Sequence, residues 1–137
     1  MSTIRPIVLL LARAALGAIF ILHGWQKMHI WGIDATAATF AKLGVPYAEN
    51  AARGAAWGEL VGGILLIIGL ALPLVSLVLV GDMAASIYFS HFEAGFWNTD
   101  GGWEWPLGLI AALLAVGYAN SGGYSADHYL MRGFGGG

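Results

Sequence analysis

The sequence predicts an all-α fold, namely a four-helix transmembrane bundle with a short interfacial helix in the first long loop. Of its 137 residues, 58% are hydrophobic and only 10% are charged. In soluble domains about half of the residues are apolar and about a quarter are charged. The mean hydropathy is +0.73. Four apolar stretches approach the ~20 residues that a helix needs to cross ~30 Å of hydrocarbon. This composition argues against disorder and against a soluble enzyme.

Charge and cysteine content exclude further classes. Six Lys and Arg against eight Asp and Glu give a net charge of −2, so the chain lacks the basic surface of a nucleic-acid-binding protein. It contains no cysteine, which excludes disulfides, thiol exchange and Cys-bound metals. The length fits one integral membrane domain, residues 1–137.

The predicted spans are separated by recognisable breaks. The first begins after Pro6 and ends at His23 and Gly24. Pro73 divides the second span from the third, which therefore form a tight hairpin, and the fourth is short enough to end within the headgroup layer. The four spans cover residues 7–22, 54–72, 74–92 and 104–118.

Two long connections and a tail lie between and after these spans. In the first connection, Asp34 can cap a short helix over residues 35–43 that Gly44 and Pro46 stop. Phe40 and Leu43 of this helix would face the membrane surface or the end of the bundle. The two connections and the tail cover residues 24–53, 93–103 and 121–137. The tail is rich in glycine, and we expect it to be partly flexible and frayed over Gly133–Gly137.

Four crossings place both termini on one side of the membrane and both long loops on the other. All six tryptophans fall at the loop end: Trp25, Trp31, Trp57, Trp97, Trp103 and Trp105. An aromatic belt at the membrane interface explains part of this bias, and a functional loop surface is the alternative. Three cations lie on each side, counting the amino terminus, so orientation is weakly determined. We expect cytoplasmic termini, because residues 93–104 contain three acidic residues and no cation.

Small residues predict how the helices pack, since close backbone approach drives helix association in lipid. The second span carries Gly54, Gly58 and Gly62 at four-residue spacing, followed by Gly63. We expect this stripe to pack against another helix, with a homo-oligomer interface as the alternative. The other small-residue surfaces are formed by Ala14, Gly17 and Ala18, and by Gly108 and Ala112.

Charged residues inside the membrane call for partners. Arg13 and Asp82 lie at similar depths from the terminal side, about 10 and 12 Å by helical rise. We therefore predict that they pair in the bundle interior, either as an ion pair that fixes helix register or as part of a substrate or proton relay. Glu59 is the rival partner of Arg13, but it lies nearer the loop side.

A second polar layer is expected near the loop end. The candidate catalytic residues there are His23, Glu59, His91 and Glu104, because imidazoles and carboxylates can exchange protons near neutral pH. Tryptophans beside them could stack on a flat ring, so the layer predicts a pocket for a quinone-like molecule. The candidate substrate-binding residues, including the mid-depth pair, are Arg13, Asp82, Gln26, Lys27, Trp25, Trp57 and Trp105.

Plainer interpretations of this layer stay open. The histidines and glutamates could simply reach interfacial water. A metal site of His23, His91 and Glu59 has suitable ligand types but no spacing signature, and two histidines at helix ends suit a haem poorly. We therefore predict no metal. A weak internal echo, with residues 20–23 matching residues 88–91, suggests a parallel two-helix repeat.

Four segments of the chain resemble the DoxX family of small bacterial membrane proteins. They read LGAIFILHGWQKM, FAKLGVP, GELVGGILLIIGL and NSGGYSADHYL, in that order within residues 8–130. The resemblance implies a four-helix bundle in the bacterial cytoplasmic membrane. The family positions it implies are Arg13, His23, Gly24, Gln26, Lys27, Glu59, Gly62, Gly63, Glu104, Gly123, Tyr124, Ser125 and Asp127. Residues 121–123 depart from the Gly-Pro-Gly-Arg pattern that is more common there.

The resemblance leaves the function open, and whether the chain is itself an enzyme stays undecided. Related DoxD-type proteins are subunits of thiosulfate:quinone oxidoreductase, and other relatives are linked to redox assemblies with soluble enzymes. A quinone-binding redox subunit, with a soluble or peripheral partner at the tryptophan-rich loops, is therefore the first hypothesis. The alternatives are a non-enzymatic scaffold for a partner enzyme and a small-molecule carrier, which would need a homo-oligomer.

Overall fold

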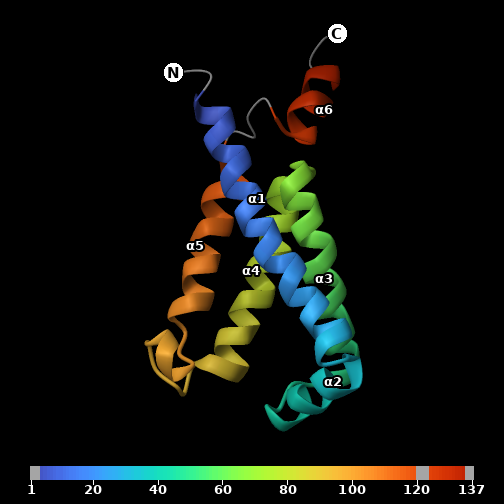
Figure 1. The fold of residues 1–137 in the computed structure, drawn as a ribbon, viewed down its shortest axis with the longest axis vertical. Coiled ribbons are helices and arrows are strands. Elements are labelled where there is room, and N and C mark those ends of the chain that lie inside the picture. Colours follow the sequence, from blue (N-terminus) through green and yellow to red (C-terminus); the bar gives the residue numbers. More distant parts are fainter. Residues whose placement is uncertain (1–3, 120–123, 135–137) are drawn as a thin grey trace.

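The computed structural model describes residues 4–119 and 124–134 and confirms the all-α prediction, with no strand in this part of the chain. Four long helices form the bundle, both chain ends lie at one end of it, and the two long connections lie at the other (Figure 1). We call these the terminal end and the loop end. The helices are α1 (Ile4–Trp25), α2 (Ile33–Lys42), α3 (Ala48–Ile68), α4 (Leu72–Ser86), α5 (Glu104–Tyr118) and α6 (Ala126–Phe134).

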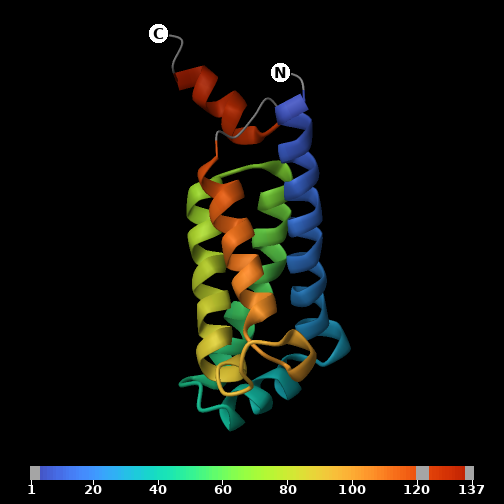
Figure 2. The ribbon, with the colours of Figure 1, turned by 90° about the vertical axis from the view of Figure 1, so that its left-hand side faces the viewer.

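Three of the helical segments are long and apolar enough to cross a membrane: Ile4–Ile30, Ala48–Ile68 and Leu72–His91. α5 is also apolar but has only 15 residues, about 22 Å of helix at 1.5 Å per residue. Its bounds coincide with the predicted 104–118, and its length leaves it short of a ~30 Å hydrocarbon layer. Figure 2 shows it running beside α4 within the bundle.

The turn between α3 and α4 differs from the prediction. The break lies at residues 69–71, because Gly69 has φ +79° and Ala71 has φ +53°, both in the left-handed region that ends a helix. The N–H of Gly69 donates to the carbonyl of Leu65 at 2.8 Å. Pro73 does not mark the break. It lies in the first turn of α4, where the missing N–H of proline leaves no helical hydrogen bond unmade.

Both α1 and α4 are prolonged at the loop end by a wide turn, η1 (Gln26–Ile30) and η2 (Ile87–His91). Each is closed by a hydrogen bond between residues five apart, from Trp31 N–H to Gln26 O at 2.8 Å and from Phe92 N–H to Ile87 O at 2.7 Å. The order of long helix, wide turn, connection and returning helix thus occurs twice. The two histidines of the sequence echo do not match in it, since His23 precedes η1 and His91 ends η2.

The first connection contains α2, and the second contains the short turn η3 (Asn98–Asp100). α2 starts slightly before the predicted residue 35, and its N-cap residue is Gly32. The expected Asp34 cap is wrong, because Asp34 lies inside the first turn. Thr36 holds this helix to η1, since its buried hydroxyl contacts the carbonyl oxygens of Lys27 at 3.2 Å and Gly32 at 2.9 Å.

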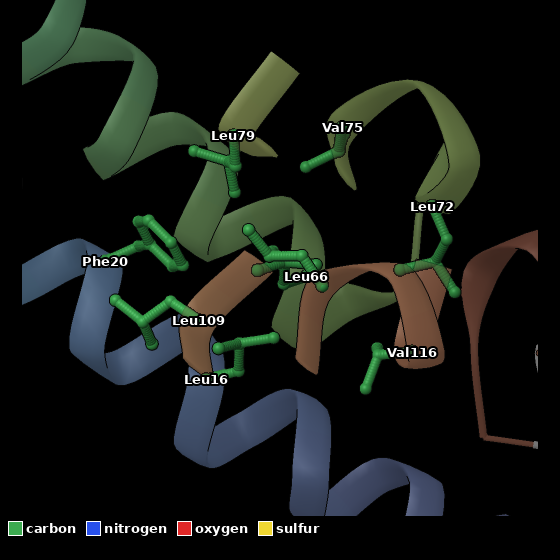
Figure 3. Close-up of a cluster of buried hydrophobic side chains, with 9 residues drawn as sticks. Leu16, Phe20, Leu66, Leu72, Val75, Leu79, Leu109 and Val116 are labelled. Carbon is green, nitrogen blue, oxygen red and sulfur yellow. The ribbon is translucent and has the colours of Figure 1, made fainter. Parts of the chain in front are cut away.

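A single apolar core joins the four long helices in the half of the bundle nearer the terminal end (Figure 3). α1, α4 and α5 each contribute residues at helical spacing, which aligns their apolar side chains on one inward face, and α3 contributes Leu66. The core consists of Leu16, Phe20, Leu66, Leu72, Val75, Leu79, Leu109, Leu113 and Val116.

Close backbone contact joins α1 to α3 through Gly17 and Gly63, both among the predicted small residues, and through Gly24. A Cβ on Gly17 would lie 2.5 Å from the carbonyl oxygen of Gly63, and one on Gly24 would lie 2.6 Å from that of Ala56. Gly17 and Gly24 lie seven residues apart on α1, and their partners Gly63 and Ala56 lie seven residues apart on the antiparallel α3. One face of small residues therefore extends along two turns of both helices. Lipid offers no hydrophobic drive for such pairing, so close contact of this kind stabilises it.

The predicted stripe on α3 is only partly correct. Gly62 contacts the side chain of Leu79 on α4, but a Cβ added at Gly54 or Gly58 would have no neighbour within 4 Å. Helical geometry separates them, because a four-residue spacing drifts around the helix and only part of such a stripe can face one partner. Gly108 of α5 is open in the same way.

The tail contains a helix that the sequence analysis did not predict, α6 over residues 126–134. Two parts of the tail lie outside the described residues. The departure from the family pattern falls on residues 121–123, and most of the expected fraying falls on residues 135–137. α6 starts next to the α3–α4 turn, since the N–H of Asp127 donates to the carbonyl of Gly69 at 2.9 Å.

Candidate functional site

A buried ion pair lies at the loop end of the bundle. Lys27 Nζ donates to Glu59 Oε1 at 3.0 Å, with side-chain exposures of 15% and 2%. η1 turns Lys27 inward from the end of α1, and Glu59 lies on the inward face of α3 with Ala56 and Gly63. A charge buried this deeply requires a partner.

Asp82 of α4 completes the group. It interacts electrostatically with Glu59 and Lys27, and its carboxyl group is near enough to that of Glu59 to share a hydrogen bond. Asp82 Oδ2 is fully buried and receives no hydrogen bond from any described residue. We call Lys27, Glu59 and Asp82 the polar cluster. It contains one basic and two acidic side chains, and the hydrogen bond of the Lys27 ammonium group goes to Glu59.

The helices place the polar cluster directly beyond the apolar core. Gly62 of α3 contacts Leu79 of α4, and Glu59 and Asp82 each lie three residues from those positions toward the loop end. In α5, Pro106 and Leu109 are buried, and Leu109 belongs to the same core as Leu79. The polar cluster therefore combines side chains from three chain segments, about one turn beyond the core residue Leu79.

The structure contradicts the predicted Arg13–Asp82 pair. Arg13 is 1% exposed, and its guanidinium donates to the carbonyl oxygens of Tyr124 at 2.7 Å, Ile67 at 3.4 Å and Leu66 at 3.5 Å. α1 extends beyond the α3–α4 turn at the terminal end (Figure 1). Arg13 is therefore level with the end of α3, while Asp82 lies ten residues into α4, about 15 Å further along.

Arg13 belongs instead to a second polar group at the terminal end. The Asp127 carboxylate accepts from the N–H groups of Ala71 at 2.7 Å and Leu72 at 2.9 Å, which open α4, and it attracts Arg13 electrostatically. Arg13 caps the end of α3, where free carbonyls carry partial negative charge, and Asp127 caps the start of α4. We call Arg13, Tyr124 and Asp127 the terminal clasp.

Residues predicted for the second polar layer do not all meet. His23 Nδ1–H donates to Ile19 O at 2.8 Å within its own helix, and His91 Nδ1–H donates to Gly101 O at 2.7 Å in the loop. In both rings the proton is assigned to Nδ1 because a carbonyl oxygen only accepts. Glu104 Oε2 accepts from the N–H of Asn98 at 3.5 Å. His91 and Glu104 therefore organise the second connection.

Aromatic side chains surround the bundle more than they line its interior. Trp25, Trp57 and Trp105 are each about half exposed, and the Trp25 ring contacts His29 at 4.1 Å between centroids. Gln26 is half-buried in η1. Within residues 4–119 and 124–134, no three His, Asp or Glu side chains lie together as a group that could hold a metal ion, so His23, His91 and Glu59 do not form one.

Sequence reasoning missed two features of these groups. It assigned Asp82 to the same layer as Arg13, whereas Asp82 joins Lys27 and Glu59. It also gave Asp127 no structural role, although the sequence offers a signal, since an acidic residue in the family's closing motif suits the free N–H groups at a helix start.

The fold and these buried groups define an integral membrane protein of the helical-bundle class. A family model described as DoxX matches residues 8–92. The inner membrane protein YphA of Escherichia coli strain K12 is 30% identical over 132 residues, covering 90% of each chain. No solved structure matches the chain. The chain belongs to the DoxX family, and it is a multi-pass protein of the bacterial inner membrane.

Proposed function

We propose that this DoxX-family protein is the membrane subunit of a quinone-linked redox system and that the polar cluster binds the quinone head group. The observation that carries the proposal is the burial of Lys27, Glu59 and Asp82 together beside the apolar core. Buried ionisable groups in a membrane bundle are costly, which makes them candidates for a functional site.

The chemistry of the cluster suits a quinone. A quinone carbonyl accepts hydrogen bonds, and Lys27 has three N–H donors, of which one reaches Glu59. The ring needs an apolar surface, which Pro106 and Leu109 of α5 can offer. Sites for small molecules commonly combine apolar walls with a few polar groups that fix orientation.

This chain would supply binding and proton exchange. It has no cysteine and so no thiol to carry electrons, and a redox-active partner protein would deliver them. The quinone link comes from the DoxD-type relatives, which are subunits of thiosulfate:quinone oxidoreductase.

Binding of a short-chain quinone to purified protein in nanodiscs tests the proposal. We expect Glu59→Gln to weaken binding about tenfold or more, because it removes the carboxylate that positions the Lys27 ammonium group, and a hydrogen bond from a charged group contributes ~1.5–3 kcal/mol. Glu49→Gln is the matched control, because Glu49 is exposed and its ion-pair partner among the described residues is Arg53. If Glu59→Gln binds the quinone as tightly as wild type, the site assignment is wrong, whereas His23→Ala should bind like wild type because His23 lies outside the polar cluster.

A scaffold for a partner enzyme is a second candidate, favoured by the second connection. Its loop is fixed by hydrogen bonds from Trp103 N–H to Gly95 O and from Glu104 N–H to Phe96 O, both 2.9 Å. Trp97 remains largely exposed on it. A photo-cross-linking residue at position 97 that traps no stoichiometric partner in cells would count against the scaffold.

A further inference from the structure

We infer that the polar cluster selects the reduced, hydroxyl-bearing form of its ligand, a quinol, over the quinone. This inference rests on the proposed function and specifies which redox form of the ligand the site holds. The feature that carries it is Asp82 Oδ2, a buried acceptor atom to which no described residue donates a hydrogen bond.

The geometry of the cluster leaves Asp82 Oδ2 without a hydrogen-bond donor among the described residues. Lys27 is the cation of the cluster, and its ammonium group donates to Glu59 Oε1 rather than to Asp82. Glu59 offers oxygens only, so an ionised Glu59 cannot donate to Asp82. A buried oxygen left without a donor is unfavourable, and a ligand that brings a hydroxyl to Asp82 Oδ2 would relieve this.

Other titratable groups near the loop end are engaged elsewhere. His23 Nδ1–H donates to Ile19 O, and His91 Nδ1–H donates to Gly101 O. Glu104 accepts from a backbone N–H in the second connection, and α5 presents apolar residues toward the core. None of these hydrogen bonds reaches Asp82, so its environment is set by Lys27 and Glu59.

The two ligand forms differ in the property that matters here. Both oxygens of a quinone are carbonyls, which accept hydrogen bonds and cannot donate them. A quinol hydroxyl can donate to Asp82 Oδ2 and at the same time accept from Lys27. The reduced form therefore satisfies both sides of the cluster, whereas a quinone satisfies Lys27 alone and places its own oxygen near a carboxylate.

Comparing both redox forms on full-length protein in nanodiscs tests the inference. The probes are decylubiquinone, decylubiquinol kept reduced under argon, and the dimethyl ether of decylubiquinol, which has no hydroxyl to donate. For wild type we expect the quinol to bind about tenfold or more tightly than the quinone, and the dimethyl ether to lose this advantage. In Asp82→Asn, the amide N–H can donate to a quinone carbonyl, so the ratio should fall to about one or below.

The outcomes separate the inference from the proposed function. If neither form binds wild type, the proposed function fails. If both bind equally, or if Asp82→Asn keeps the preference, the inference is overturned and quinone binding stands. Equal binding is also expected if Glu59 and Asp82 satisfy each other with a shared proton. Glu49→Gln should keep the wild-type ratio, and the dimethyl ether provides the test on wild type should Asp82→Asn fail to fold.

Discussion

At the residue scale, each buried charge of the bundle has a different kind of partner. Arg13 is held by backbone carbonyls and by Asp127, whereas Glu59 is held by a lysine side chain. Removing one member of a buried pair leaves an uncompensated charge, while an exposed pair gains little because water solvates both ions. The buried Lys27–Glu59 pair and the exposed Arg53–Glu49 pair allow a direct comparison of the two cases.

We predict that Lys27→Met lowers the free energy of unfolding by about 3–5 kcal/mol, because Glu59 is left buried and unpaired. Arg53→Met is the control and should change it by about 0–1 kcal/mol, since its pair with Glu49 is exposed. Denaturant unfolding in detergent micelles measures both. The double variant Lys27→Met/Glu59→Met should recover much of the loss, and equal effects of the two single variants would contradict the prediction.

The terminal clasp leads to a second residue-scale prediction. Asp127→Ala removes the acceptor for the first N–H groups of α4, so we expect about 0.5–2 kcal/mol lower stability. Asp34→Ala is the control, since Asp34 makes no side-chain cap in α2. Thermal unfolding in the same detergent compares them. A loss no greater than that of Asp34→Ala would show that the clasp does not stabilise the turn.

At the element scale, close packing of α1 on α3 depends on glycines that face each other. Gly17→Ala would bring a methyl group to 2.5 Å from Gly63 O and must move the helices apart. We expect about 1–3 kcal/mol lower stability. Gly58→Ala meets no neighbour and should stabilise by up to about 1 kcal/mol through helix propensity. Unfolding of both variants in detergent tests this, and a neutral Gly17→Ala would refute the packing.

At the scale of the whole molecule, burial changes the charge count that orients the protein. Lys27 is paired inside the bundle, which leaves Lys42 and Arg53 at the loop end. Arg5, Arg132 and the amino terminus remain at the terminal end. Each end then has two Lys or Arg, and the amino terminus gives the terminal end one further positive charge. Because positive charge favours the cytoplasmic side, we predict that the termini are cytoplasmic and the loops periplasmic.

The absence of cysteine makes this orientation easy to measure. Glu49→Cys and Tyr129→Cys place single thiols at exposed positions of the loop end and the terminal end. In spheroplasts, a membrane-impermeant maleimide should label Glu49→Cys directly and Tyr129→Cys only after lysis. Labelling in the reverse order would place the termini in the periplasm.

The candidate site shows how far sequence reasoning reached. Glu59 and Asp82 were identified from the sequence because a charged residue in an apolar span stands out, and Lys27 because it follows His23 within a turn and matches the family pattern. They were assigned to two separate layers, because depth along one helix says nothing about how far it is offset from the next. The extension of α1 beyond the α3–α4 turn shifted Arg13 away from Asp82 and toward Tyr124.

The sequence by itself determined that this is an α-helical membrane protein of the DoxX family and where its spans fall, because these depend on the length and apolarity of single segments. The tertiary structure alone decided which polar side chains meet and which glycines pack. Those contacts join residues such as Arg13 and Tyr124, or Gly17 and Gly63, that are distant in the chain. They depend on the register between helices, which the left-handed turn at Gly69 and Ala71 and the packing of the core establish.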